Sequence, residues 1–114
     1  MELPTRSASM TIDEYAEWAA SVPQPSFGSE AERLAYPALG LVGEAGEVAD
    51  TVRRSMREGN LEDGRLVYEL GDLIFHWACL VTALGHSPSG LLAQSQDNIK
   101  ARLAAREPRS APRD

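Results

Sequence analysis

Apolar residues recur along this chain at the three- and four-residue spacing of an α-helix. No stretch alternates apolar and polar residues for long enough to form a β-strand. The first helix is predicted to begin at Thr11, because Thr11 and Glu14 have the spacing of a capping box. It is predicted to end before Pro23, which cannot continue a helix.

Three further helices are predicted, separated by glycine-containing turns. The second ends at Glu58 and begins at either Ser29 or Pro37. The choice stays open because a proline can lie in the first turn of a helix or can interrupt a helix. The third spans about residues 62–84 and the fourth about residues 88–106. The fold class is therefore all-α, with four helices joined by short turns as in a helical bundle. We expect a folded domain over residues 11–106, a flexible N-terminus over 1–10 and a disordered tail over 107–114.

The composition limits what such a chain can do. Its 114 residues fit one small domain, and a domain of this size favours an oligomer because its own core is limited. A single cysteine excludes an intrachain disulfide and a cysteine-based zinc cluster. The net charge of -6 argues against a nucleic acid polymer as partner. We expect a cytoplasmic protein, because we find neither a membrane-spanning run nor an apolar signal region.

The charge is unevenly distributed. Residues 97–114 carry five basic and three acidic side chains, whereas the preceding part carries six basic and fourteen acidic ones. An acidic body followed by a basic end suggests separate sites for cations and for anionic groups.

The third predicted helix has two carboxylates where apolar residues are expected. Apolar side chains surround its axis, so it should be buried on all sides, partly by another subunit. Glu69 and Asp72 lie three residues apart in its middle and project from one face. Buried carboxylates are costly unless they are paired or bind a metal. The alternative to a metal is an ion pair with an arginine of the second helix.

The second predicted helix repeats this spacing with Glu44 and Glu47. Alone, this pair would be a solvated helix edge. If the two helices pack antiparallel, the four carboxylates face one cleft, and their mutual repulsion calls for cations. Oxygen ligands select Mg²⁺, Mn²⁺ or Ca²⁺. A di-iron site is disfavoured because the Glu-x-x-His pattern is missing.

These residues resemble the MazG-type all-α nucleoside triphosphate pyrophosphohydrolases. The similarity covers about residues 10–106 and rests on the runs GLVGEAGEVADTVRR and ELGDLIFHWACLVTALG. It implies an oligomeric four-helix bundle of the all-alpha NTP pyrophosphatase type. It also implies that a triphosphate is cleaved between its α- and β-phosphates. The resemblance further implies four catalytic carboxylates that bind Mg²⁺, with Mn²⁺ as a possible substitute: Glu44, Glu47, Glu69 and Asp72. One of them, Glu47, could instead act as the base.

The resemblance also indicates substrate-binding residues. In the fourth helix Asn98 matches a position near the phosphates, and either Lys100 or Arg102 supplies the positive charge. Trp18 and His76 are candidates to stack on the nucleobase. Further aromatic candidates are Tyr15, Phe27 and Tyr36.

Two other functions stay open at this stage. One is a phosphoribosyl-ATP pyrophosphatase-like enzyme, and the other is a non-catalytic nucleotide-binding regulatory helical module. The expected partners are a nucleoside triphosphate and further copies of the chain, in a homodimer or homotetramer. The alternative to a second copy is a different protein that pairs with the third predicted helix. Neither the base nor the number of metal ions follows from the sequence.

Overall fold

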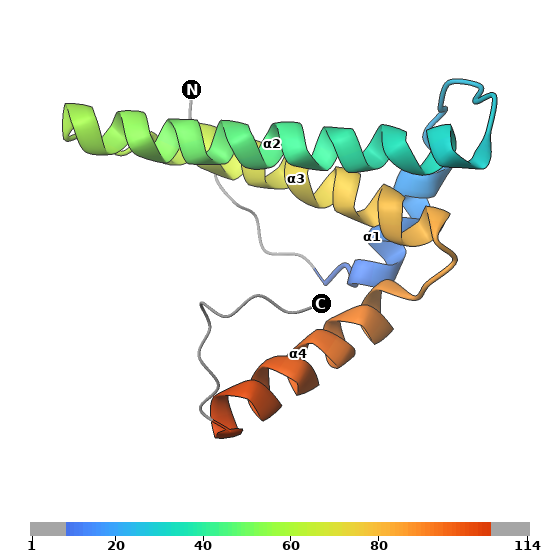
Figure 1. Ribbon diagram of the computed structural model, residues 1–114. Helices are drawn as coiled ribbons and strands as arrows, with labels where there is room; N and C mark the ends of the chain where they lie inside the picture. Colours follow the sequence, from blue (N-terminus) through green and yellow to red (C-terminus); the bar gives the residue numbers. More distant parts are fainter. Residues whose placement is uncertain (1–8, 106–114) are drawn as a thin grey trace.

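The computed structural model describes residues 9–105, which form four α-helices and no strand (Figure 1). The all-α prediction is therefore confirmed for this part of the chain. The predictions for most of the N-terminus and for the tail lie outside the described residues. The helices are α1 (Ile12–Ser21), α2 (Glu30–Glu58), α3 (Asp63–Ala83) and α4 (Pro88–Ala105).

Side-chain caps fix the beginnings of α1 and α2. The Glu14 amide donates to the Thr11 hydroxyl at 3.0 Å and the Thr11 amide donates to the Glu14 carboxylate at 2.8 Å, so the predicted capping box is confirmed. The Ser29 hydroxyl accepts from the Glu32 amide at 3.2 Å and caps α2. The open choice for the start of α2 is thereby settled at Ser29, and Pro37 lies buried inside the helix.

Glycines end α2 and follow α3, as predicted. Gly59 has a φ angle of 69° and Gly85 one of 79°, values in the left-handed region that L side chains rarely adopt. The Ser87 hydroxyl then accepts from the Gly90 amide at 3.1 Å and caps α4.

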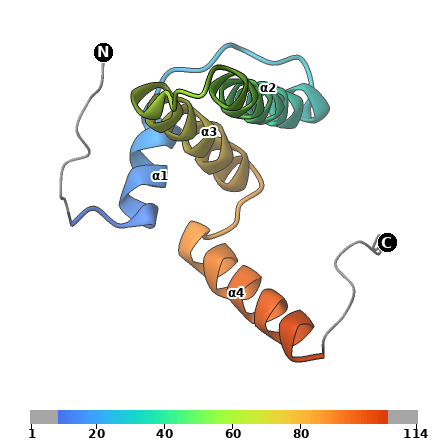
Figure 2. The same ribbon diagram turned by 90° about the vertical axis from the view of Figure 1, so that its left-hand side faces the viewer.

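The long helices α2 and α3 form an antiparallel hairpin, and α1 packs against the end of α3 away from the hairpin turn (Figures 1 and 2). Alanines form the buried core between α1 and α3: Ala16, Ala19 and Ala78 are buried together. Larger side chains surround this small core, namely Tyr15, Phe75, Trp77 and Cys79.

Helix α4 extends away from the other three helices. It contacts α1 and α3 near its first turn but does not contact α2, and both views show it pointing away from the hairpin (Figures 1 and 2). The radius of gyration is 16.7 Å, against about 13 Å for a compact domain of this length. The four helices therefore do not close into a bundle within one chain. The predicted burial of α3 is also incomplete here, since Leu70 is 51% exposed.

Helix α3 is the one helix of the described part that is long and apolar enough to cross a membrane by length and composition. The core helix of a soluble protein meets the same criteria. Each of the other three helices contacts α3, and α3 carries two of the carboxylates described below.

Gly40 of α2 makes room for the ring of His76 on α3. A Cβ atom at Gly40 would lie 2.5 Å from His76 Nδ1, whereas one at Gly43 would meet nothing within 4 Å among the described residues. We expect Gly40→Ala to destabilise the chain by about 1–2 kcal/mol because the ring must move. Gly43→Ala should stabilise it by up to about 1 kcal/mol, since alanine favours a helix. Urea unfolding measures both, and His76→Ala should relieve the effect of Gly40→Ala. Equal stability of the two glycine variants would contradict this prediction.

Candidate functional site

Contacts at two levels fix how α2 and α3 lie side by side. Near the turn, Arg54 Nε donates to Glu62 Oε2 at 2.8 Å, and the neighbouring Ser55 hydroxyl accepts from the Glu62 amide at 3.3 Å. Further along the hairpin, the His76 ring lies against Gly40. In an antiparallel pair each step forward on one helix matches a step back on the other. This register applies to every residue between the two contacts.

The register brings the two carboxylate pairs together. Glu44 lies one turn from Gly40 along α2, and Asp72 lies one turn from His76 along α3, so these two carboxylates share a level. Glu47 and Glu69 share the next level towards the turn. All four line one open cleft of about 800 Å³. The residues that line it are Glu44, Glu47, Asn60, Leu61, Glu62, Gly64, Arg65, Tyr68, Glu69 and Asp72.

Glu69 has the most restricted environment of the four. It is only 6% exposed, and its Oε1 atom is buried without a hydrogen-bond partner among the described residues. Its Oε2 atom lies 3.7 Å from Arg65 Nη1, a long ion pair with a side chain that is 57% exposed. A buried carboxylate oxygen without a partner is unfavourable. Glu69 is therefore suited to bind a cation in the cleft.

The predicted alternative to a metal is an ion pair between a buried carboxylate of α3 and an arginine of α2. The structure shows a different ion pair. Arg54 of α2 pairs with Asp50 at 3.2 Å and with Glu62 at 2.8 Å. The basic partner of Glu69 instead comes from α3 itself. Arg65 Nε also lies 3.6 Å from Glu62 Oε1, so Arg65 connects Glu69 to the charged network at the turn.

The donor set of the cleft suits a hard divalent cation. The four side chains offer carboxylate oxygens, the ligands that Mg²⁺ and Mn²⁺ prefer. Within residues 9–105 no three potential ligand side chains converge closely enough to hold a metal as they stand. Binding would require the carboxylates to rotate towards one point, and the unpaired oxygen of Glu69 favours that movement.

Arg65 and Tyr68 are among the lining residues that the sequence did not identify. Arg65 lies one turn before Glu69 on the same face of α3, and Tyr68 lies beside Glu69 with 64% of its surface exposed. The four-residue spacing between Arg65 and Glu69 would have indicated the arginine. Arg65 gives the acidic cleft a cation that can meet a phosphate.

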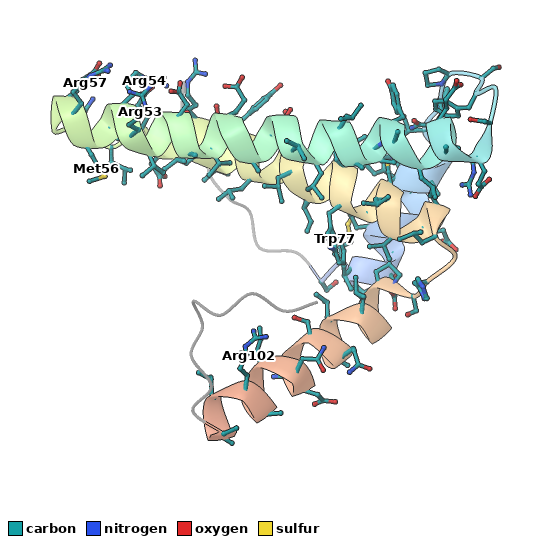
Figure 3. The ribbon with its side chains drawn as sticks, viewed as in Figure 1. Arg53, Arg54, Met56, Arg57, Trp77 and Arg102 are labelled. Atoms are coloured by element: carbon teal, nitrogen blue, oxygen red, sulfur yellow. The ribbon has the colours of Figure 1, made fainter. Side chains whose placement is uncertain are left out.

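The predicted phosphate-binding residues of α4 do not line this cleft. Asn98 and Lys100 are exposed, and the Asn98 Oδ1 atom accepts from Gln94 Nε2 at 3.0 Å. Figure 3 shows Arg102 on the side of α4 that faces the hairpin, with Met56 on the facing side of α2. Their role in substrate binding stays a prediction, and it requires a different placement of α4 relative to a cleft.

The predicted nucleobase-binding residues also lie outside the lining of the cleft. Trp18 is 54% exposed and packs against Phe75 with a ring distance of 5.9 Å. Half-buried His76 lies between α2 and α3, one turn beyond Asp72. Their stacking on a base stays a prediction.

Comparison with known proteins identifies the family of this chain. Residues 35–109, about two thirds of the chain, match the MazG nucleotide pyrophosphohydrolase domain. No curated protein and no solved structure gives a significant match. The matched segment contains most of α2, all of α3 and α4, and all four cleft carboxylates. The chain therefore belongs to the MazG nucleotide pyrophosphohydrolase family.

Proposed function

We propose that this protein is a Mg²⁺-dependent nucleoside triphosphate pyrophosphohydrolase that converts a ribo- or deoxyribonucleoside triphosphate to the monophosphate and pyrophosphate. Clearing the nucleotide pool is the physiological role that we infer. One observation carries the proposal: two helices place four carboxylates along one cleft, and one carboxylate oxygen is buried without a partner. Family membership supports the general reaction.

The side chains of the cleft would have different roles in the hydrolysis. Glu44, Glu69 and Asp72 would hold Mg²⁺, or Mn²⁺ in its place, with Glu47 either as a fourth ligand or as the base; when bound, the ion would neutralise phosphate charge and activate water. As the base, Glu47, which lines the cleft and is exposed, would take the proton from the attacking water. A new P–O bond forms to water as the P–O bond between the α- and β-phosphates breaks. Pyrophosphate is the leaving group, and Arg65 is placed to pair with phosphate charge.

A second copy of the chain completes this proposal. Large apolar side chains stay exposed on the hairpin and on α4, so one chain leaves much apolar surface in water. A homodimer or homotetramer would cover it and bring Asn98, Lys100 and Arg102 of one copy towards the cleft of another. The exposed apolar residues include Leu39, Val42, Met56, Leu70, Leu92 and Leu103. The protein would act in the cytoplasm on a single nucleotide, without a nucleic acid polymer or a membrane as partner.

Pyrophosphate release from a panel of triphosphates tests the proposal. We expect release with Mg²⁺ for at least one ribo- or deoxyribonucleoside triphosphate and none with EDTA. Phosphoribosyl-ATP belongs in the panel, because preferred cleavage of that compound would identify the alternative enzyme. Tight nucleotide binding without release from any member would instead indicate a non-catalytic module.

The Arg65→Gln variant tests the phosphate contact in the cleft. We expect kcat/KM to fall by about 10- to 100-fold, because a charge-assisted contact is lost. Arg65→Lys should recover part of this loss, since lysine retains the charge. Arg57→Gln is the control, because Arg57 lies on α2 and does not line the cleft. Steady-state pyrophosphate release measures all three, and unchanged kinetics of Arg65→Gln would remove Arg65 from the site.

A further inference from the structure

A contact outside the cleft joins the start of α4 to α1. In the first turn of α1, the Asp13 Oδ1 atom accepts from the Ser89 amide at 2.9 Å, and its Oδ2 atom accepts from the Ser89 hydroxyl at 2.6 Å. Both oxygens of one carboxylate thus hold one residue of α4, 76 positions away in the chain.

The contact supplies what the start of α4 lacks. Pro88 has no amide hydrogen, and the Ser87 hydroxyl accepts from the Gly90 amide. The Ser89 amide would be left without an intrahelical partner, and Asp13 accepts from it. A negative side chain is also favourable at a helix N-terminus. The hydroxyl and amide of Ser89 hold the pKa of Asp13 below its usual value, so the carboxylate is ionised in neutral solution.

The backbone that carries Asp13 is itself held in place. The neighbouring Glu14 and Thr11 form the capping box of α1, which sets the conformation of this turn. Beyond its first residues α4 has few other supports: Pro88 is the one buried residue of this helix, and α2 does not contact it. Within residues 9–105, Asp13 is therefore the side chain that links α4 to the rest of the protein by hydrogen bonds.

A small rotation at this link is enlarged along α4. The helix has 18 residues and is about 27 Å long. Asn98 lies ten residues after Pro88, or about 15 Å along the axis, so a rotation of about 10° at the base moves it by about 3 Å. Such a shift is as large as a hydrogen-bond distance and would separate a side chain from a phosphate.

We propose that Asp13 is a positioning residue, which sets the angle of α4 and thereby places Asn98, Lys100 and Arg102 for the cleft of a second copy. Its effect on substrate binding rests on the proposed function and the proposed assembly. Its effect on α4 does not, because the two hydrogen bonds lie within one chain.

Three variants weaken the contact between Asp13 and Ser89 to different extents. Asp13→Ala loses both hydrogen bonds, and Ser89→Ala keeps the one from the backbone amide. In Asp13→Asn the amide oxygen can accept from the Ser89 backbone amide and the NH2 group can donate to the Ser89 hydroxyl, without the charge. We expect Asp13→Ala to raise KM for the preferred triphosphate about five-fold with little change in kcat, the size expected for loss of one helix cap. Ser89→Ala should be intermediate, and Asp13→Asn should recover most of the loss. Glu17→Ala is the control, since Glu17 is exposed on the same helix and has no hydrogen bond or ion pair among the described residues.

Amide hydrogen exchange of α4 provides a readout that does not depend on catalysis. We expect faster exchange over residues 88–105 in Asp13→Ala and unchanged exchange in α2. An unchanged KM together with unchanged exchange in Asp13→Ala would overturn the proposal, as would faster exchange with an unchanged KM in an active enzyme. A wild-type protein without activity would overturn the proposed function, while exchange would still show whether Asp13 holds α4. If Asp13→Ala fails to fold, Ser89→Ala and Asp13→Asn provide the same comparison.

Discussion

Replacing Glu69 by Gln is expected to abolish Mg²⁺-dependent pyrophosphate release, with a loss of at least about 100-fold in kcat/KM. The substitution keeps the shape of the side chain but removes the negative charge that a divalent cation requires. It acts at the most buried of the four carboxylates, whose Oε1 atom lacks a hydrogen-bond partner among the described residues. Asp72→Asn should have an effect of the same order, because Asp72 lines the same cleft one turn from Glu69 on the same face.

The same variants should fold at least as well as the wild type in EDTA. Glu69 has only a long ion pair with a half-exposed arginine to lose, and such a pair contributes at most about 1 kcal/mol. Removing one negative charge from an acidic cleft relieves repulsion. Urea unfolding in EDTA and in Mg²⁺ therefore separates the two effects: Mg²⁺ should stabilise the wild type but not Glu69→Gln. Glu58→Gln, at the end of α2 and outside the cleft, is the control. Activity of Glu69→Gln close to that of the wild type would remove Glu69 from the metal site.

The local elements of this fold could be predicted because short-range signals determine them. Thr11 with Glu14, Gly59 and Gly85 mark helix ends through contacts or φ angles within a few residues. The beginning of α2 was ambiguous because Ser29 and Pro37 are both good N-terminal residues, and the hydroxyl of Ser29 decided it by capping an amide. The placement of α4 could not be predicted, because its hydrogen bonds to α1 join residues 76 positions apart.

The same distinction applies to the site. Glu44, Glu47, Glu69 and Asp72 could be assigned to one cleft because their spacing and a short turn define the register of a helical hairpin. The neighbouring Arg65 was overlooked, although its spacing from Glu69 is equally regular. Side chains of α4 cannot be placed at a cleft from one chain, since no contact of the described residues brings α4 to α2. In the proposed assembly their placement depends on a second copy, whose position neither helix spacing nor the fold of one chain specifies.

Mixing two inactive variants is expected to restore activity if α4 acts on a second copy. Glu69→Gln inactivates a cleft, and the double substitution Lys100→Ala, Arg102→Ala inactivates an α4. In a mixed oligomer, the intact cleft of one copy can meet the intact α4 of the other. When equal amounts of the two variants pair at random, about a quarter of the sites combine an intact cleft with an intact α4. About a quarter of wild-type activity should therefore return. Pyrophosphate release after the two proteins are unfolded together and refolded measures this recovery.

A second mixture distinguishes shared sites from simple stabilisation. Glu69→Gln and Asp72→Asn both damage the cleft, so no pairing of these two variants produces an intact cleft with an intact α4, and no activity should return. Copies that carry different affinity tags show whether mixed oligomers form in each case. Recovery in the first mixture alone requires that a cleft and an α4 from different chains act together. Mixed oligomers without recovery would instead show that each chain supplies its own α4, which would have to swing towards its own hairpin from the position seen in Figure 1.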